Sequence, residues 1–438
     1  MGASPAKPLL NESEKPTGTH FLILAMSWAG WLFDFYDLML FSFLAIPIKK
    51  SLALSDSSLS LLVGTTLAAT ALGGIVFGWL ADRFGRKTVL SWTILVYSFG
   101  AFMCGFAQGA AWLAVCRVIT GLGVGGEWAT GQTLVGETFP ARMRGRFAAV
   151  MQTGAPLGIA LASVIGGFLQ PALASSFGPE WGWRGCFFVS VVPALLVVLI
   201  RRHMPESDVW LERRRLATAK ESGQVRHLLT TPGLRRMFIL GLVLATTDMS
   251  AYWFTYSWMP RYLYEHLGSS IGKAGIWMLV TQTGGTLGYL SFGIVADWKG
   301  RRVAYTIYSF IWAIGLFAVT WFWGTLAVYP AMTILFMFLV GLGTGNYSGY
   351  GPIFSEIFPT RVRNTAMGTA FNLARGVQFF TPLVITIVAT RYGLGGGISL
   401  AGFFALITGA WVWTLPETRG TKIGIEPAQE PPAQGAVA

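Results

Sequence analysis

The stretch GWLADRFGRK at residues 78–87 recurs in degenerate form as GIVADWKGRR at residues 293–302, a shift of 215 residues. A second pair, ETFPARMR at 137–144 and EIFPTRVR at 356–363, recurs at a shift of 219. Because the two shifts are nearly equal, the chain contains one unit twice. Each copy of the first stretch lies between two long apolar segments, so the repeated unit consists of membrane-spanning hairpins. Two such halves facing each other are typical of secondary transporters.

The composition also indicates a membrane protein. Of 438 residues, 53% are hydrophobic and only 12% are charged, which is too little charge to cover a soluble surface of this size. Apolar segments near the ~20 residues that a helix needs to cross a bilayer lie at 21–47, 59–80, 88–107, 111–136, 145–170, 183–201, 236–262, 272–296, 303–323, 329–357, 365–390 and 396–414. They lack the alternating pattern of barrel strands. We therefore expect an all-α membrane protein with twelve transmembrane helices in two pseudo-symmetric six-helix bundles.

The net charge of +12 does not indicate nucleic-acid binding, because the basic residues gather on one side of the predicted membrane. If the first 20 residues are cytoplasmic, the loops on that side carry 20 Lys and Arg residues and the opposite loops carry six. Cytoplasmic loops are enriched in Lys and Arg. The bias predicts a multi-pass protein with both termini in the cytoplasm, and the short loops favour a bacterial inner (plasma) membrane.

A long polar stretch between the sixth and seventh apolar segments divides the two halves. PES at 205–207, after the sixth segment, is matched by PET at 416–418 after the twelfth, which closes the repeat. The predicted parts are a cytoplasmic N-terminal tail at 1–20, an N-terminal six-helix bundle at 21–201, a cytoplasmic interdomain loop at 202–235, a C-terminal six-helix bundle at 236–414 and a cytoplasmic tail at 415–438.

The repeated charged loops are candidates for a gate latch. Gly85 permits a tight turn, and Asp82 can accept hydrogen bonds from a neighbouring helix N-terminus. Arg86 can bridge to an acid such as Glu137. The alternative is that these charges set only the topology. The predicted gating residues of both copies are Asp82, Arg83, Gly85, Arg86, Glu137, Arg144, Asp297, Arg301, Glu356 and Arg363.

Charges inside the spans are candidates for proton coupling, because each costs roughly 2.5–3.5 kcal/mol at a helix centre. Burial raises the pKa of a carboxylate and a neighbouring Arg lowers it, so a pair that opens and closes can bind and release a proton. The predicted proton-coupling residues are Asp34, Asp37, Arg117, Glu127 and Asp248. Our first choice is Asp34 or Asp37 paired with Arg117, and Glu127 is the second choice. A fixed salt bridge between the first and fourth helices is the alternative.

Arg375 in the eleventh span is the predicted substrate anchor. Its guanidinium stays charged and can hold a carboxylate through two hydrogen bonds. It lies near the depth of Asp248, so the alternative is that the two residues only form a stabilising pair. Tyrosines of the seventh and tenth spans can stack on an organic substrate, although such residues also form belts at membrane interfaces. The predicted substrate-binding residues are Arg375, Asn372, Gln378, Asn346, Tyr347, Tyr350 and Tyr256.

These motifs together resemble the major facilitator superfamily: GWLADRFGRK between the second and third spans, RVITGLGVGGE in the fourth and PARMRGR after it. The resemblance covers roughly residues 20–415. FDFYD in the first span, GGEW in the fourth and the Arg of the eleventh are similar to proton-coupled organic-acid symporters, including sialate, lactate and aromatic-acid permeases. The resemblance implies that helices 1, 4, 7 and 10 line a central cavity. Trp298 and Lys299 depart from the pattern, so we expect a weaker latch in the second half.

We therefore expect a secondary active transporter that imports a small organic anion, a monocarboxylate or related organic acid, with protons by alternating access. The expected partners are that anion, protons and the lipid bilayer, without nucleic acid, and a monomer is the default. No cofactor, ATP site or metal centre is predicted, since the Gly-rich stretches lie inside apolar spans and the histidines are scattered. A proton-coupled exporter of a drug or metabolite and a transport-inactive nutrient sensor remain alternatives. We do not expect an enzyme.

Overall fold

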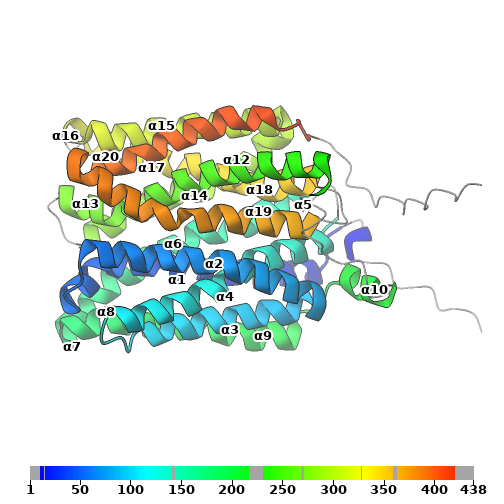
Figure 1. Cartoon of the computed structure of the whole chain (residues 1–438), viewed down its shortest axis with the longest axis horizontal. Coiled ribbons are helices and arrows are strands. Elements are labelled where there is room, and N and C mark those ends of the chain that lie inside the picture. The colour runs from blue at the N-terminus through cyan, green and yellow to red at the C-terminus, as the bar shows by residue number, and fades with distance from the viewer. Residues whose placement is uncertain are drawn as a thin grey trace, which may run out of the picture.

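The structure, a computed structural model, describes residues 10–13, 15–140, 144–216, 230–267, 271–326, 328–358 and 363–419. Within these ranges every regular element is a helix, as the sequence predicts. Figure 1 shows long helices running side by side, with the first and the last described residues at the same end of the molecule. We call this end the terminal face and the other end the opposite face.

The first half contains six membrane crossings. They are α1 (Gly18–Ser51), α2 (Asp56–Phe84), α3 (Arg86–Cys104), α4 (Ala110–Thr138), the run α5 (Arg144–Gln152), α6 (Gly154–Val164), η2 (Ile165–Leu169) and α7 (Gln170–Phe177), and the run α8 (Pro179–Phe188), η3 (Val189–Val191) and α9 (Val192–His203). The short helix α10 (Asp208–Leu216) follows at the terminal face. Residues 217–229 of the predicted interdomain loop lie outside the described part.

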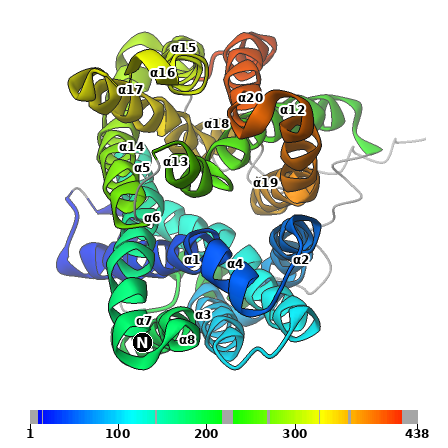
Figure 2. The same cartoon turned by 90° about the vertical axis from the view of Figure 1, so that its left-hand side faces the viewer.

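The second half repeats this plan. Its elements are α12 (Pro232–Tyr256), α13 (Met259–Leu267), α14 (Ile271–Lys299), α15 (Arg301–Trp321), α16 (Trp323–Leu326), α17 (Pro330–Gly343), η4 (Thr344–Gly349), α18 (Tyr350–Ile357), α19 (Arg363–Val377), η5 (Gln378–Phe380), α20 (Thr381–Trp411) and η6 (Val412–Thr414). Figure 2 shows the two halves as separate groups, with the α1–α9 group below and the α12–α20 group above.

The number of crossings agrees with the prediction once three helices are considered. Nine helices of the described chain are long and apolar enough to cross a membrane. The one at Ala366–Thr414 contains a non-helical residue, Gly393 with φ 68°. Figure 1 shows α20 turning back at the opposite face, so this span makes two crossings. Helices α4 and α14 have 29 residues each, which also exceeds the length of about 20 that a crossing requires. Together they account for the twelve predicted helices.

The repeated motif forms the same tight turn in both halves. Gly85 connects α2 to α3 with φ 99°, and Gly300 connects α14 to α15 with φ 104°. This left-handed region carries no steric cost only for glycine. The sequence repeat is therefore a repeat of backbone conformation.

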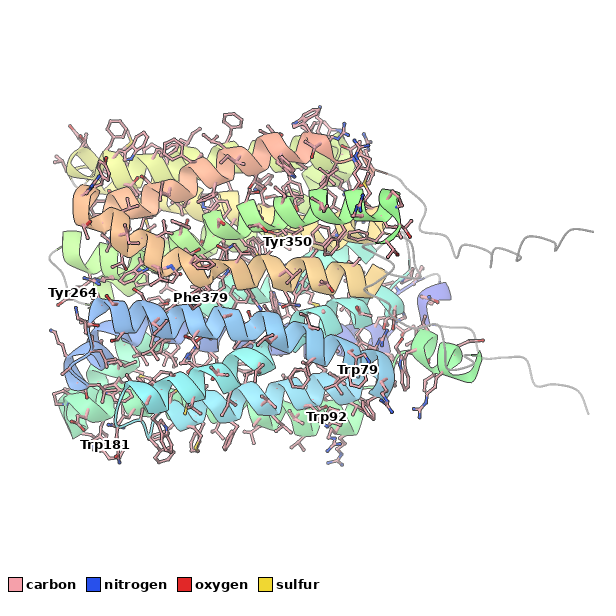
Figure 3. The ribbon with its side chains drawn as sticks, in the orientation of Figure 1. Trp79, Trp92, Trp181, Tyr264, Tyr350 and Phe379 are labelled. Carbon is pink, nitrogen blue, oxygen red and sulfur yellow. The ribbon has the colours of Figure 1, made fainter. Side chains whose placement is uncertain are left out.

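Aromatic side chains mark both ends of the outer surface. Figure 3 places Trp181 and Tyr264 near the opposite face, and Trp79 and Trp92 toward the terminal face. Trp79 and Trp181 are more than half exposed. Such amphipathic rings are enriched where a membrane meets water, which agrees with a bilayer around the molecule.

Glycines in the Gly-rich stretches allow helices to approach closely, as predicted. A Cβ on Gly125 of α4 would lie 2.0 Å from the Thr70 carbonyl oxygen of α2. A Cβ on Gly341 of α17 would lie 1.7 Å from the Thr281 carbonyl oxygen of α14. Both partners are backbone atoms, so neither contact can relax through a side-chain rotation.

Gly125→Ala is therefore expected to lower the free energy of unfolding by about 1–3 kcal/mol, the usual cost of overpacking. Gly136→Ala, in the same helix, is the matched control, because a Cβ there meets nothing within 4 Å. The thermal-unfolding midpoint of the purified protein should fall for the first variant and hold or rise for the second. Equal midpoints would contradict the close packing of α2 and α4.

Candidate functional site

Arg375 lies between the two halves of the molecule. It occupies the last turn of α19, and its side chain is 1% exposed. Its Nη2 lies 3.9 Å from Oδ2 of Asp34, which is on α1 in the first half and is 0% exposed. Neither residue faces an open crevice in this state. The pair joins the halves at the surface along which they would have to separate.

Three aromatic rings surround the Arg375 guanidinium. Its Cζ lies 5.6 Å from the ring of Trp31, 5.7 Å from Phe35 and 5.5 Å from Phe371. A guanidinium over aromatic faces is stabilised by the ring quadrupoles, more strongly when water is excluded. None of these rings is among the residues predicted from the sequence. Helical spacing is a signal for two of them, since Phe371 lies four residues before Arg375 and Trp31 lies three residues before Asp34.

Asp248 is not the partner of Arg375, so that sequence alternative is wrong for this state. Its two carboxylate oxygens accept hydrogen bonds from Tyr350 Oη at 2.7 Å and Asn346 Nδ2 at 3.3 Å. The same amide of Asn346 also donates to Ser309 Oγ at 3.0 Å. The Asp248 carboxylate is therefore held within the second half, whereas Arg375 points across the interface.

Of the two predicted partners of Arg117, Asp34 lies beside Arg375 instead, whereas Asp37 stays within electrostatic reach of Arg117. Asp37 accepts a hydrogen bond of 2.5 Å from Ser190 Oγ of η3. Arg117 donates through Nε to Thr66 Oγ1 at 3.2 Å and lies over the Phe41 ring. Positions three apart on a helix are rotated by about 60°, enough to direct Asp34 to the interface and Asp37 into the first half.

Glu127 of α4 is buried without a polar partner in the described part of the chain. Its side chain is 0% exposed, and neither carboxyl oxygen has a hydrogen bond. Its Oε1 would lie 2.6 Å from a Cβ on Gly30 of α1. An uncompensated buried charge is costly, so this carboxyl group requires an explanation.

Two of the predicted substrate ligands pack against the protein itself. Asn372 lies against Gly74 of α2, and its Nδ2 donates to the Gly368 carbonyl at 2.9 Å. Gln378 donates to the Ala374 carbonyl at 3.0 Å and accepts from Thr381 Oγ1 at 2.7 Å. In this state the Asn372 Oδ1 has no hydrogen-bond partner among the described residues, whereas Gln378 has partners for both ends of its amide.

The predicted aromatic residues form one connected group beside the charges. Tyr347 contacts Tyr350 at a ring-centroid distance of 5.1 Å and Tyr252 at 4.4 Å. Tyr252 contacts Tyr256 at 4.6 Å and also Phe35 of the first half at 5.9 Å. Figure 3 places Tyr350 well inside the bundle. These rings do not belong to an interfacial belt, because all are buried.

A layer of side chains closes the interface between Arg375 and the terminal face. The Trp128 ring of α4 stacks on Phe371 of α19 at 3.6 Å with an 11° interplanar angle. Trp128 Nε1 donates to Gln152 Oε1 at 3.0 Å, and Gln152 Nε2 donates to the Tyr347 carbonyl at 3.1 Å. The Trp128–Phe371 stack and the Gln152–Tyr347 hydrogen bond join the two halves. Trp128 and Gln152 are further residues that the sequence reasoning missed.

Polar contacts close the interface at the opposite face. Arg261 of α13 and Lys49 of α1 each lie 2.8 Å from Oδ1 of Asp56, the first residue of α2. Ser60 of α2 and Thr386 of α20 share a hydrogen bond of 3.1 Å. The buried charges are thus covered toward both faces, as in a closed state between two openings.

The latch of the first half holds together residues of that half. Arg86 Nη2 lies 3.3 Å from Glu137 Oε1, and Glu137 Oε2 accepts from Ser207 Oγ at 2.5 Å. Glu206 accepts from the backbone N–H groups of Arg86 and Lys87 at the start of α3, at 2.9 and 3.1 Å. The PES stretch is therefore part of the latch, a role that the sequence reasoning did not assign.

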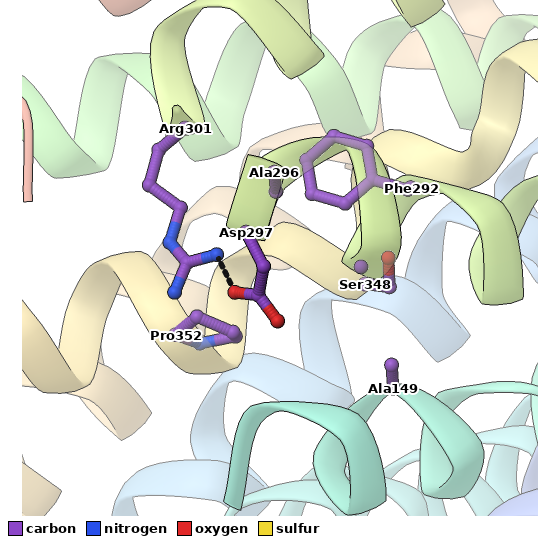
Figure 4. A pocket seen from close by; sticks show the side chains of 8 residues that line it. Ala149, Phe292, Ala296, Asp297, Arg301, Ser348 and Pro352 are labelled. Atoms are coloured by element: carbon purple, nitrogen blue, oxygen red, sulfur yellow. Dashed lines mark hydrogen bonds and ion pairs between the residues drawn. The ribbon is translucent and has the colours of Figure 1, made fainter. Parts of the chain in front are cut away.

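The second half repeats the latch. Arg301 lies 3.0 Å from Glu356 Oε1 and 2.7 Å from Asp297 Oδ1, and Thr418 donates to Glu356. Figure 4 shows Arg301 and Asp297 beside a small cleft that Ala149 of the first half also lines. The departures at 298 and 299 leave the paired residues Arg301, Asp297 and Glu356 in contact, and the relative strength of the two latches stays a prediction.

Glu417 takes the place of Glu206 in this second latch. It accepts hydrogen bonds from the backbone N–H groups of Arg301 at 2.9 Å and Arg302 at 3.2 Å. Partial burial acts to raise the pKa of Glu417, but these donors and those of Thr418 and Arg419 outweigh it, so the pKa lies below its usual value. Arg83 is exposed beside the Trp79 ring. The side chains of Asp82, Arg144 and Arg363 lie outside the described part.

Comparisons with known proteins identify the family of this chain. The sequence model described as Major Facilitator Superfamily matches residues 26–345. A putative metabolite transport protein of Haemophilus influenzae is 31% identical over 90% of this chain and 95% of its own. The cis,cis-muconate transport protein of Acinetobacter baylyi is 31% identical over 91% and 95%. A sialic acid transporter of Escherichia coli is 31% identical over 85% and 88%.

A solved structure shows the same fold. The proton:xylose symporter bound to 6-bromo-6-deoxy-D-glucose superposes with a TM-score of 0.75, covering 92% of this chain and 97% of that one. The two sequences are 21% identical. This likeness concerns the arrangement of the helices alone.

Proposed function

This chain belongs to the major facilitator superfamily, a family of transporters and not of enzymes, and from that premise we propose that it imports a small organic anion, a monocarboxylate or related organic acid, together with protons. Transport would proceed by alternating access, with the two halves rocking about the buried charges. The terminal face would be cytoplasmic, and the membrane would be a bacterial inner membrane, as the excess of basic residues at that face and the bacterial relatives suggest.

The ion pair between Arg375 and Asp34 is the observation that supports this proposal most. It is buried, it joins the two halves, and it lies among aromatic rings. Arginine can bind a carboxylate through two parallel hydrogen bonds. Its Nη1 has no partner among the described residues, so the guanidinium retains a free donor. We assign Tyr347, Tyr350 and Tyr256 to the aromatic wall of the opened site, with Asn346, Asn372 and Gln378 as polar neighbours.

Charge balance explains why the anion and a proton would move together. When an anion takes the place of Asp34 at Arg375, the Asp34 carboxylate loses its cation. Leaving that charge buried is costly, whereas binding one proton removes it. Binding the anion alone or the proton alone would leave an uncompensated buried charge and prevent the halves from closing. Asp37, Arg117, Glu127 and Asp248 are the further candidates for this coupling, and the two latches would steady each half as it rocks.

Uptake into proteoliposomes tests the proposal. Purified protein would be reconstituted and supplied with labelled lactate, benzoate, cis,cis-muconate and sialic acid under a proton gradient. Accumulation of at least one acid, abolished by a protonophore, is the expected result. Counterflow that responds neither to pH nor to the protonophore would instead indicate a uniporter. Accumulation only when protons move in the reverse direction would indicate an exporter.

A further inference from the structure

The sequence repeat places two buried clusters in corresponding positions. A shift of 214, close to that of the first motif, relates Asp34 to Asp248. The shift of 219, which relates the second pair of motifs, relates Glu127 to Asn346 and Gly131 to Tyr350. Each half therefore has an aspartate on its first crossing and a second polar side chain on its fourth, Glu127 in one half and Asn346 in the other. The second half has an amide where the first half has a carboxyl group.

In the second half both oxygens of the aspartate accept a hydrogen bond. The Asn346 amide donates to Asp248 and to Ser309, and the Tyr350 hydroxyl donates to the other oxygen of Asp248. Asn346 acts there as a neutral donor. An amide keeps its N–H groups at every pH of interest, so this aspartate always has a donor beside it.

In the first half the corresponding donors are missing. Gly131 supplies no hydroxyl, and among the described residues neither oxygen of Asp34 or of Glu127 has a hydrogen bond. Arg375 pairs with Asp34 at 3.9 Å, and no ion pair to Glu127 lies within 4.0 Å in the described chain. An ionised Glu127 would be a second buried anion next to a single cation. Two buried anions beside one cation leave a net buried charge, and burying that charge is costly.

Gly30 provides the space that the longer side chain occupies. Glu127 Oε1 would lie 2.6 Å from a Cβ at this position, and Gly30 is one helical turn from Asp34 on α1. Residues four apart on a helix are neighbours on its surface, so the Glu127 carboxyl group lies within side-chain reach of Asp34. The titratable or charged groups that act on Glu127 are Asp34 of α1, Arg375 of α19 and Tyr97 of α3, whose hydroxyl donates to the Gly30 carbonyl at 3.4 Å.

We propose that Glu127 is a neutral carboxylic acid in this closed state, and that its O–H group is the donor within reach of Asp34 once Arg375 leaves that aspartate, in the place that the Asn346 amide takes beside Asp248. Glu127 is then a positioning residue that keeps a resident proton. Asp34 is the acid that gains the transported proton when the anion takes Arg375 and loses it when the anion leaves. The protonation of Glu127 concerns the protein alone, whereas the role of Asp34 in proton transport rests on the proposed function.

Infrared spectroscopy of the purified protein near neutral pH tests the protonation of Glu127 without any substrate. A protonated carboxyl group has a carbonyl band that a carboxylate lacks. We expect one such band in the wild type to be lost in Glu127→Gln and kept in Asp37→Asn, the control for a neighbouring buried acid. A spectrum that is unchanged by Glu127→Gln would overturn the proposal.

Transport variants test the positioning role. Glu127→Gln should retain much more gradient-driven uptake of the acid found active in the proteoliposome panel than Glu127→Ala does, because a glutamine copies the donor of Asn346. Glu127→Ala removes the donor and should lower uptake by at least tenfold. Gly30→Ala should act like Glu127→Ala, because its Cβ takes the space of the carboxyl group. Gly18→Ala is the matched control on α1, where a Cβ meets nothing within 4 Å.

The outcomes separate this inference from the proposed function. If Glu127→Gln loses gradient-driven accumulation but keeps counterflow, Glu127 itself exchanges the proton and the inference is wrong. If the panel finds no transported acid, the proposed function fails, yet the infrared spectra still decide whether Glu127 is protonated. A pH profile of uptake that is the same in Glu127→Gln and the wild type would support the resident proton.

Discussion

Replacing Arg375 by glutamine is expected to lower the rate of organic-anion uptake by roughly 30-fold to 3,000-fold, the equivalent of the 2–5 kcal/mol lost when a buried charge pair loses one partner. The loss has two sources. The substrate carboxylate loses its cation, and Asp34 is left buried without its ion pair. Arg375→Lys should recover little of the rate, because an ammonium cannot form the two parallel hydrogen bonds of a guanidinium. Initial uptake rates in proteoliposomes measure both variants.

A double variant distinguishes binding from a purely structural role. Arg375→Gln with Asp34→Asn removes both charges of the pair, so no buried charge remains uncompensated and the thermal-unfolding midpoint should return toward that of the wild type. Uptake should stay as low as in Arg375→Gln, because the anion has no cation to bind. If the double variant transports as the wild type does, Arg375 serves stability alone and the carboxylate site lies elsewhere.

Replacing Glu356 by alanine is expected to lower the free energy of unfolding by about 3 kcal/mol, the lower end of the range for breaking a buried ion pair. Glu356 and Arg301 are 11% and 9% exposed at their side chains, and Glu356 also accepts from Thr418. The removal affects three elements, since α18, α15 and the segment after η6 meet at this carboxylate. The lower end of the energy range applies because Arg301 keeps its ion pair with Asp297. The thermal-unfolding midpoint of the purified variant measures the effect.

Asp297→Ala is the control within the same cluster. It removes the other acid from Arg301, but this side chain is 46% exposed. Exposed pairs contribute at most about 1 kcal/mol, so the midpoint should change little. Should the two variants prove equally stable, burial would not be what makes the latch strong. The corresponding variant of the first half, Glu137→Ala, should resemble Glu356→Ala.

Much of the architecture was predictable from local sequence features. Long apolar segments determine where helices cross, because a backbone in lipid must satisfy its own hydrogen bonds. The repeated GWLADRFGRK motif predicted two similar halves, and the glycines at 85 and 300 form the same turn in each. The resemblance to a transporter family rested on these motifs and is confirmed by the family match. The residues proposed for substrate and proton remain predictions that the variants above test.

The sequence by itself determined which residues are helical, that the chain spans a membrane as two similar halves, and that a few charges lie within the spans. Only the tertiary structure decided which of those charges meet: Arg375 pairs with Asp34 across the halves, Asp248 with Asn346 and Tyr350 within one. Depth along a helix follows from counting residues at 1.5 Å each. The direction in which a side chain points depends on how each helix is rotated against its neighbours, and that rotation is set by packing between segments far apart in the sequence.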